Sequence, residues 1–255
     1  MTSPRIASLV PSVTELLAAL GLAPRLVART GYCIHPALAV AGIAKVGGTK
    51  QVNLVKLRRL APTHVIVNVD ENQVQTVEAL RGFVPQVLVT HPCGPEDVAA
   101  LICQIATAFR DEPGVTERAA ALTAELATEL SVTVACQGPE VAVLYLIWRD
   151  PWMTVARDTY IAGMLARVGW RTQPDADGGE RGAARYPVVH GDEPWLAEVE
   201  QVLLSSEPYA FTDAHVAQAQ ALCPQARVRL LDGELLSWYG PRTAAGLRYL
   251  RGLVG

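Results

Sequence analysis

The chain has 255 residues, of which 50% are hydrophobic and 18% are charged, and its formal net charge is −3. This composition excludes a disordered chain, and the lack of a basic cluster argues against a nucleic-acid partner held by phosphate contacts. A chain of this length can form one large domain or two small ones.

The first part of the chain alternates short apolar runs with amphipathic segments. Arg5–Pro11 is typical of a buried strand, and Ser12 with Glu15 forms a capping-box pattern that predicts a helix over 13–20. Further strands are expected at 26–30, 64–69 and 86–91, and helices at 53–60, 72–82 and 95–110. This alternation predicts a parallel, helix-flanked sheet over residues 5–111.

The middle of the chain, PGVTERAAALTAELATELSVTVA over 113–135, predicts one long helix. Its apolar residues recur at spacings of three and four: Val115, Ala119, Leu122, Leu126, Leu130 and Val134. Such a helix is roughly 30 Å long, enough to cross a small domain. We therefore expect a rigid connector between two lobes, with the functional site in the gap between them.

The second part of the chain repeats the alternation. Strands are expected at 140–148, 153–156, 201–205 and 228–231, helices at 159–168, 193–199, 215–222 and 241–253, and a mobile loop at 172–187. The predicted fold class is α/β, with two Rossmann-like lobes that contain parallel sheets and are joined by one long backbone α-helix. The expected domains are an N-terminal lobe at 1–112, the connecting helix at 113–135 and a C-terminal lobe at 136–255.

Candidate binding residues follow the predicted strands, because ligands of open α/β sheets bind beyond the carboxyl ends of the strands. The first lobe places Tyr32, Cys33, His35, Asn68, Asp70, Glu71, His91 and Cys93 there, and the second lobe places Trp148, Arg149, Trp152, Arg157, Glu207, Tyr209, Trp238, Tyr239 and Arg242. Flat aromatic rings at such an edge suit a large, partly apolar ligand. The alternative for each tryptophan is packing in a small core, and for each arginine an ion pair.

Two Cys/His pairs give a second hypothesis. Cys33 with His35, and His91 with Cys93, follow strands of the same lobe and are ligand types that suit zinc or a similar metal. The spacings match no known zinc module, which argues against a zinc site. A cytoplasmic metal protein or metalloenzyme that uses these four residues is the alternative to a ligand-binding protein. The sequence has no GxGxxG or Walker loop, which disfavours a nucleotide cofactor.

Five cysteines without a CxxC pair indicate free thiols in a reducing compartment. The opening MTSPRIASLVPS enters a strand pattern without an apolar leader, and no apolar run reaches the length of a membrane span. The sequence as given predicts a cytoplasmic protein, and a periplasmic one if a leader was removed or the start is misassigned.

Several stretches of the chain resemble the helical-backbone substrate-binding proteins of ABC importers, the family of vitamin B12-binding and siderophore-binding components. These stretches are RIASLVPSVTELLAALGL, RTGYCIHP, VGGTKQVNLVKLRRLAPTHVIVNVDEN, LYLIWRDPWMTVARDTYIAGMLARVGW, LLSSEPYAF and LSWYGPRT, and the resemblance covers nearly the whole chain.

The resemblance implies a non-catalytic protein that holds a cobalamin-like, haem-like or ferric siderophore-like ligand between its lobes, with no intrinsic cofactor. It places Tyr32, the Thr49–Lys50 turn and the Asn68–Glu71 segment among the first-lobe contacts, and Ser237–Arg242 in the cleft of the second lobe. It also implies an ABC permease as partner, contacted by an acid on each lobe, for which Glu71 or Glu78 and Glu207 are the candidates. We expect a monomer. The alternative here is a cytoplasmic sensor or scavenger that keeps the binding-protein fold.

Overall fold

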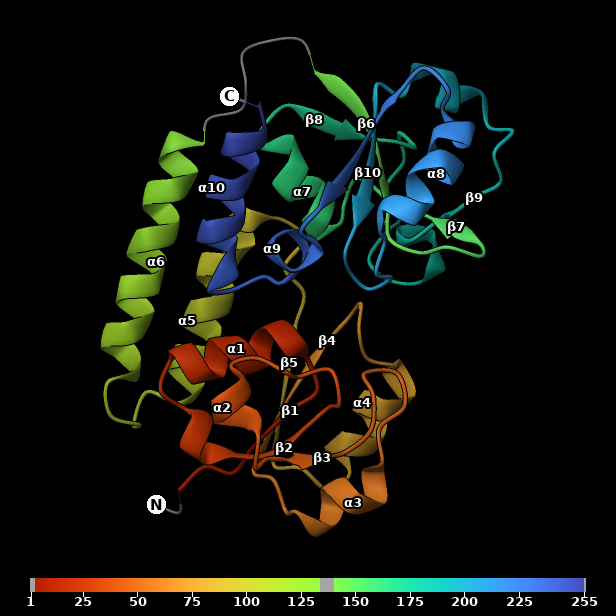
Figure 1. The fold of residues 1–255 in the computed structure, drawn as a ribbon. Coiled ribbons are helices and arrows are strands. Elements are labelled where there is room, and N and C mark those ends of the chain that lie inside the picture. Colours follow the sequence, from red (N-terminus) through yellow and green to blue (C-terminus); the bar gives the residue numbers. More distant parts are fainter. Residues whose placement is uncertain (1–2, 134–139, 255) are drawn as a thin grey trace. The chain divides into compact units, whose positions relative to one another are not determined.

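The computed structural model describes residues 3–133 and 140–254. The chain divides into two compact units: unit 1 comprises Met1–Pro92 and Val98–Glu125, and unit 2 comprises Cys93–Asp97 and Leu126–Gly255. The helix α6, Val115–Val132, is continuous and belongs to unit 1 up to Glu125 and to unit 2 from Leu126 (Figure 1). The chain therefore changes unit after Pro92, after Asp97 and after Glu125. The last residues of the predicted helix, 134 and 135, and Cys136 lie outside the described residues.

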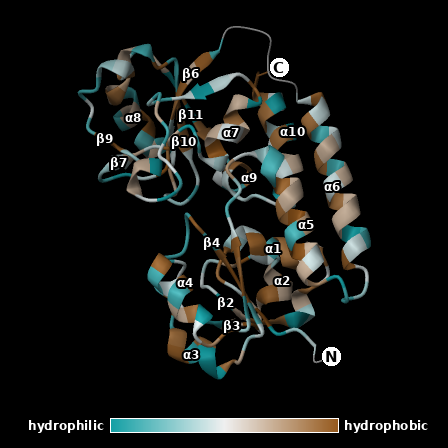
Figure 2. Ribbon diagram, turned by 180° about the vertical axis from the view of Figure 1, so that it is seen from behind, coloured by the Kyte–Doolittle hydropathy of each residue, from teal (hydrophilic) through white to brown (hydrophobic). Residues whose placement is uncertain are grey.

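Unit 1 is built on a parallel sheet in the order β3-β2-β1-β4-β5. Its strands are β1 (Ile6–Ser8), β2 (Leu26–Arg29), β3 (Ala44–Lys45), β4 (His64–Asn68) and β5 (Gln86–Thr90), and its helices before α6 are α1 (Pro11–Ala19), α2 (Ala37–Val40), α3 (Leu54–Arg59), α4 (Val74–Arg81) and α5 (Val98–Ala108). Figure 1 shows α1 and α2 on one side of this sheet and α3 and α4 on the other. The strands supply buried side chains such as Ala7, Ala28, Val65 and Val67 to one core, and they are mostly brown in the hydropathy view of Figure 2.

The start of α1 differs from the prediction. The helix begins at Pro11, two residues earlier than expected, because proline fits the first helical position. Val10 is the N-cap residue, and no side chain of the described residues caps this end. Ser12 therefore lies inside the first turn, and the predicted capping box between Ser12 and Glu15 is wrong.

Unit 2 contains a parallel sheet in the order β11-β10-β6-β8 and an antiparallel pair, β7 and β9. Its elements are β6 (Val141–Leu146), β7 (Trp152–Met153), α7 (Tyr160–Ala166), β8 (Trp170–Thr172), β9 (Val188–Val189), β10 (Gln201–Ser205), α8 (Val216–Leu222), β11 (Arg227–Leu231), α9 (Gly233–Ser237) and α10 (Arg242–Val254). Helices α7, α9 and α10 pack against one another, and Figure 1 shows α8 on the opposite side of the sheet. The two-lobed α/β fold with parallel sheets and a connecting helix is thus confirmed.

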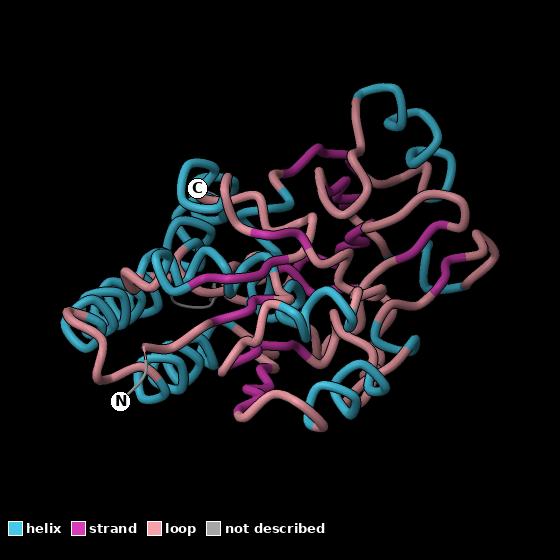
Figure 3. The backbone as a smooth tube through the Cα atoms, turned by 90° about the horizontal axis from the view of Figure 1, so that it is seen from below, coloured by secondary structure: helices cyan, strands magenta, loops and turns pink. Residues whose placement is uncertain are grey.

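The elements that the sequence did not indicate are short. The strands are drawn as brief segments between helices and loops in Figure 3, and the longest has six residues. Strands β3 and β8 and helices α2 and α9 were not predicted, because two to five residues carry no measurable hydrophobic period. The segment 193–199, predicted as an α-helix, contains a 3-10 helix at Pro194–Glu198.

The predicted mobile loop at 172–187 is anchored by a buried arginine. Arg185 is 1% exposed, and its guanidinium donates hydrogen bonds to the backbone oxygens of Gly179 and Asp158. The same group lies 3.3 Å from the Asp158 carboxylate. The loop thus has a fixed point inside unit 2.

Candidate functional site

The carboxyl edge of the unit 1 sheet gathers the predicted polar residues of that lobe. Tyr32, Cys33 and His35 follow β2, the Thr49–Lys50 turn follows β3, Asn68, Asp70 and Glu71 follow or end β4, and His91 follows β5. Strand β1 lies at the centre, and the chain proceeds to β2 on one side of it and later to β4 on the other. Such a reversal point is where open α/β sheets bind ligands.

Two buried asparagines hold this edge in shape. The amide oxygen of Asn68 accepts hydrogen bonds from the backbone N–H groups of Asp70 and Glu71 at 2.8 and 3.2 Å. Asn72 accepts one from the backbone N–H of Asn68 and donates to the backbone oxygens of Leu9 and Thr49. The two side chains therefore join the ends of β1 and β4 to the turn after β3. Sequence reasoning missed Asn72, although an amide residue so soon after a strand is a recognised turn signal.

The turn after β3 forms a small pocket with Tyr32. A pocket of about 480 Å³ is lined by Tyr32, Gly47, Gly48, Thr49, Lys50 and Gln51. The Tyr32 side chain is 64% exposed, and a Cβ added to Gly48 would lie 3.2 Å from its ring. Lys50 donates from Nζ to the backbone oxygen of Asp70 at 2.5 Å. The structure thus brings Tyr32, Thr49, Lys50 and Asp70 to one edge, as predicted.

Asp70 and His91, which follow the neighbouring strands β4 and β5, form a polar pair. His91 Nε2 lies 3.5 Å from Asp70 Oδ2, and both side chains are mostly buried. The pair is an ion pair only when the imidazole is protonated. An oxygen acceptor and a nitrogen group therefore lie side by side at the ends of β4 and β5.

The four proposed metal ligands do not assemble into a cluster. Among the described residues, no group of three or more His, Cys, Asp or Glu side chains could hold a metal ion. Cys33 is fully buried, its thiol lies 3.1 Å from Thr30 Oγ1, and burial raises its pKa. In this environment the Cys33 thiol is neutral and packs inside unit 1. Cys93 belongs to unit 2, while Cys33, His35 and His91 belong to unit 1.

The carboxyl edge of the unit 2 sheet carries an aromatic cluster. Trp148 and Trp152 come after β6, and Tyr209, Phe211 and His215 come after the neighbouring strand β10. Trp148 meets Tyr209 edge-on at 5.6 Å between ring centroids, and Trp152 stacks on Phe211 at 5.9 Å. Trp148 is 42% exposed, so this cluster presents one large ring to solvent.

Hydrogen bonds and a cation fix the orientation of this aromatic cluster. The Thr212 backbone N–H donates to His215 Nδ1, and His215 Nε2 lies within hydrogen-bond distance of the Tyr209 hydroxyl, 3.1 Å away. The Arg149 guanidinium lies 4.4 Å from the centre of the Trp152 ring. Phe211 and His215 were missed from the sequence, because neither sits directly at a strand end.

The predicted group Trp238, Tyr239 and Arg242 is packed inside unit 2. Trp238 donates from its indole nitrogen to Glu207 at 2.7 Å, and Arg242 lies 4.9 Å over the Trp238 ring while pairing with Glu234. Both aromatic side chains are buried, at 6% and 7% exposure. In this arrangement Trp238 and Tyr239 expose little surface that a ligand could contact, and Trp148 exposes more.

The three predicted docking acids differ in their surroundings. Glu78 is exposed on α4, Glu71 is half-buried after β4, and Glu207 is half-buried and accepts the Trp238 hydrogen bond. Glu78 is thus the acid most open to a partner.

Ser12, near the start of α1, is 3% exposed, and its hydroxyl has no hydrogen-bond partner among the described residues.

Comparison with known proteins identifies the class. A family model described as "Periplasmic binding protein" matches residues 6–183, which is more than half of the chain. The chain therefore belongs to the periplasmic binding protein family, in its helical-backbone class, as the resemblance implied. No helix in the described part of the chain is both long enough and apolar enough to cross a membrane.

Solved structures with the same fold align with nearly the whole chain. The periplasmic vitamin B12 binding protein BtuF of Vibrio cholerae is 18% identical, with a TM-score of 0.79 over 98% of this chain and 96% of its own. The periplasmic haem binding protein HutB of Vibrio cholerae is 20% identical, with a TM-score of 0.78 over 99% of each chain. A periplasmic haem binding protein from Pseudomonas aeruginosa is 22% identical, with a TM-score of 0.78 over 98% of this chain and 92% of its own. A search of curated proteins finds no match.

Proposed function

We propose that this chain is a non-catalytic binding protein for a metal-containing or metal-chelating small molecule, and that it serves an ABC importer. The ligand is cobalamin-like, haem-like or a ferric siderophore, and it binds as cargo while the protein holds no cofactor of its own. The observation that carries this proposal is that the carboxyl edge of each sheet presents aromatic and charged side chains. The edge in unit 1 has Tyr32 and Lys50, and the edge in unit 2 has Trp148 in edge-on contact with Tyr209. Broad rings and a few charged groups are the surface that a large, flat, partly apolar chelate requires. The names of the similar structures support the same ligand class.

The proposed ligand contacts have different roles in this scheme. Tyr32, Thr49, Lys50 and Asp70 in unit 1 and Trp148 and Arg149 in unit 2 supply direct contact. Asn68 positions the backbone of Asp70, and Trp152 packs against the Arg149 guanidinium. Trp238, Tyr239 and Arg242 pack together inside unit 2 and contribute less surface. The half-exposed rings supply stacking, which contributes about 0.5–1.5 kcal/mol per ring beyond burial. The edge of unit 1 is held by buried asparagines, and a preformed surface loses less conformational entropy when it binds.

The proposed partner is the permease of such an importer, contacted through Glu71 or Glu78 and Glu207. The family description supports a periplasmic location, and we propose that the carrier is a monomer. Glu78→Lys is expected to weaken transport without changing ligand affinity, because the exposed carboxylate lies in the second half of α4 and not at the carboxyl edge of the sheet. Loss of both properties in this variant would contradict a docking role for Glu78.

Titration of the purified protein with cyanocobalamin, haemin and a ferric siderophore tests the ligand proposal. At least one is expected to bind with a dissociation constant below about 0.1 mM, seen by absorbance or calorimetry. Trp148→Ala and Tyr32→Ala are each expected to weaken that binding by about tenfold, and they test the two units separately. Leu38→Ala is the matched control, because Leu38 is 96% exposed and lies in neither set of contacts. Absence of binding by the folded protein to all three ligands would overturn the proposal.

A further inference from the structure

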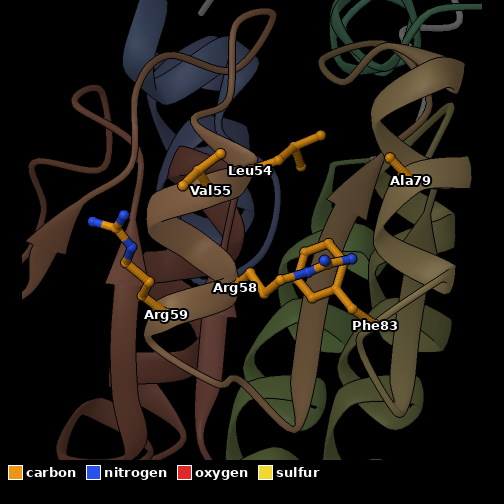
Figure 4. Close-up of a pocket in the computed structure, with 6 residues that line it drawn as sticks. All are labelled: Leu54, Val55, Arg58, Arg59, Ala79 and Phe83. Carbon is orange, nitrogen blue, oxygen red and sulfur yellow. The ribbon is translucent and has the colours of Figure 1, made fainter.

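A groove on the face of the unit 1 sheet that α3 and α4 cover is not used by the proposed ligand contacts. It lies between α3 and the end of α4, has a volume of about 370 Å³, and is lined by Leu54, Val55, Arg58, Arg59, Ala79 and Phe83 (Figure 4). Helices α3 and α4 precede β4 and β5, so this surface belongs to a face of the sheet and not to its carboxyl edge. Four of the six lining residues are apolar.

The floor of the groove is part of the folded core. Leu54 and Phe83 are partly buried and pack against the buried cluster of unit 1 that includes Leu57 and Val84. Val55, by contrast, is 65% exposed on the wall formed by α3. An exposed valine beside a fixed apolar floor is a surface that gains free energy when another apolar side chain covers it.

The α3 side of the groove is basic. Helix α3 reads LVKLRR and contains Lys56, Arg58 and Arg59 without an acidic residue. All three cations are exposed, and Arg58 is held with its guanidinium carbon 4.7 Å from the centre of the Phe83 ring. Figure 4 shows Arg58 extending to the Phe83 ring and Arg59 pointing away from it. In a chain of net charge −3, this short helix is a local positive site.

We propose that the groove between α3 and α4 binds an amphipathic, acidic helical segment of a protein partner. The partner's apolar side chains, spaced at three and four residues, lie over Leu54, Val55 and Ala79, and its flanking carboxylates pair with Arg59 and with Arg58, which covers the Phe83 ring. A ridge of side chains from a third helix fits a groove between two helices, which is a recurring mode of peptide recognition. A flat bilayer surface does not enter a concave groove, and two lining cations with an apolar floor are a poor match for a nucleic acid.

A designed peptide tests this proposal without any cargo ligand. The probe is a fluorescein-labelled helix of about 18 residues with leucines at positions i, i+3, i+4 and i+7 and glutamates on both flanks. Fluorescence anisotropy with the full chain is expected to give a dissociation constant on the order of 10–100 µM, which weakens with added salt. Val55→Glu and Arg59→Glu are each expected to weaken binding at least about tenfold, because each removes one half of the complementarity.

Matched variants separate the groove from the rest of the surface. Leu38→Glu adds the same charge at another exposed apolar residue, and Arg110→Glu reverses an exposed cation outside the groove; both are expected to bind like the unmodified chain. Thermal melts confirm that each variant is folded. The proposal is overturned if the peptide does not bind, if a scrambled peptide or one with lysines in place of glutamates binds equally well, or if Val55→Glu has no effect. Variant-sensitive binding to phosphatidylglycerol vesicles in place of the peptide would also overturn it and assign the surface to a membrane.

Discussion

Glu129 is a charged residue that is buried at a position where the hydrophobic pattern of α6 predicts exposure. It lies off the apolar stripe of α6, yet it is 9% exposed and accepts hydrogen bonds from Arg248 and Arg251 of α10, each at 2.7 Å. The hydrogen bond from Arg248 is the main cause that lowers the pKa of this carboxyl, and Arg251 adds to it. The residue therefore fixes α10 against the second half of α6 through charge.

The lowered pKa of Glu129 predicts a loss of stability in acid. A carboxyl whose pKa is lower in the folded chain contributes stability above its unfolded pKa, near 4.3, and loses it as the pH falls through the folded pKa. At pH 7, Glu129→Gln is expected to lower the free energy of unfolding by about 1–2 kcal/mol, since both arginines are partly exposed. Urea titrations at pH 7 and pH 3 measure this, and the difference between the two should be smaller in the variant. The exposed Glu198→Gln is the control; an equal change in both variants would contradict the role of the pair.

Buried and exposed thiols predict a pattern of chemical labelling. Burial raises the pKa of Cys33, and it raises the pKa of Cys223 to about 11, whereas Cys103 is exposed. We expect iodoacetamide to modify Cys103 in the folded chain at pH 8 and to modify Cys33 and Cys223 only after unfolding, as read by peptide mass spectrometry. Protection of Cys33 that disappears on treatment with a metal chelator would instead favour a metal at this residue.

At the scale of single elements, α10 contains two glycines with opposite surroundings. A Cβ at Gly246 would lie 2.2 Å from the Leu235 backbone oxygen and 2.8 Å from Met164, whereas nothing lies within 4 Å of one at Gly252. Gly246→Ala is expected to lower the free energy of unfolding by about 1–3 kcal/mol through overpacking. Gly252→Ala is expected to raise it by up to about 1 kcal/mol through helix propensity. Denaturant melts of both variants test the close approach of α9 and α10, and stabilisation by Gly246→Ala would refute it.

The edge of the unit 1 sheet depends on Asn72. Asn72→Leu keeps the approximate volume but leaves the Asn68 backbone N–H and the Leu9 and Thr49 carbonyls without this partner. We expect a loss of about 2–3 kcal/mol in unfolding free energy. Amide hydrogen exchange should also rise at Thr49–Gln51 more than at Leu26–Arg29. Uniform exchange across the unit would mean that the asparagine does not hold this turn.

The elements that the sequence predicted well are those in which a hydrophobic pattern repeats several times or in which β-branched residues follow one another. Val115–Val132 and His64–Asn68 fall within the expected ranges because their side-chain patterns repeat often enough to be read. Strand β8 was missed because its three residues, with Arg171 between two buried neighbours, resemble a loop.

At the candidate site, the expectation that binding residues follow strands placed Tyr32, Asp70 and Trp148 at the sheet edges, but it could not indicate that Trp238 is buried or that His215 contacts Tyr209. Those facts depend on contacts between residues distant in sequence, which no local pattern contains.

At the scale of the whole molecule, each unit is assembled from two stretches of chain. Unit 1 needs 98–125 as well as 1–92, and its last part contributes the buried Val115 and Ala119 and the hydrogen bond from Arg118 to the Leu20 backbone oxygen, 3.2 Å long. The expected domain limit at 112 would leave these residues out. We therefore regard Glu125 as the more informative limit for the first lobe.

Fragments of the chain test this limit. Residues 1–125 are expected to unfold cooperatively and at a higher temperature than residues 1–112, because the longer fragment retains the apolar contacts of α6. Circular dichroism melts of the two fragments measure the difference. Equal melting temperatures would show that the first half of α6 adds nothing to unit 1.

The division of the chain also bears on how this protein responds to a protease. Because the polypeptide passes between units at three places, cleavage at any one of them still leaves two covalent links between the units. A single nick after Pro92, for example, separates residues 1–92 from their own α5, which remains attached to the other piece. The two products should therefore co-elute on a sizing column and part only in denaturant, so that backbone scission and loss of native structure are separate events in this molecule.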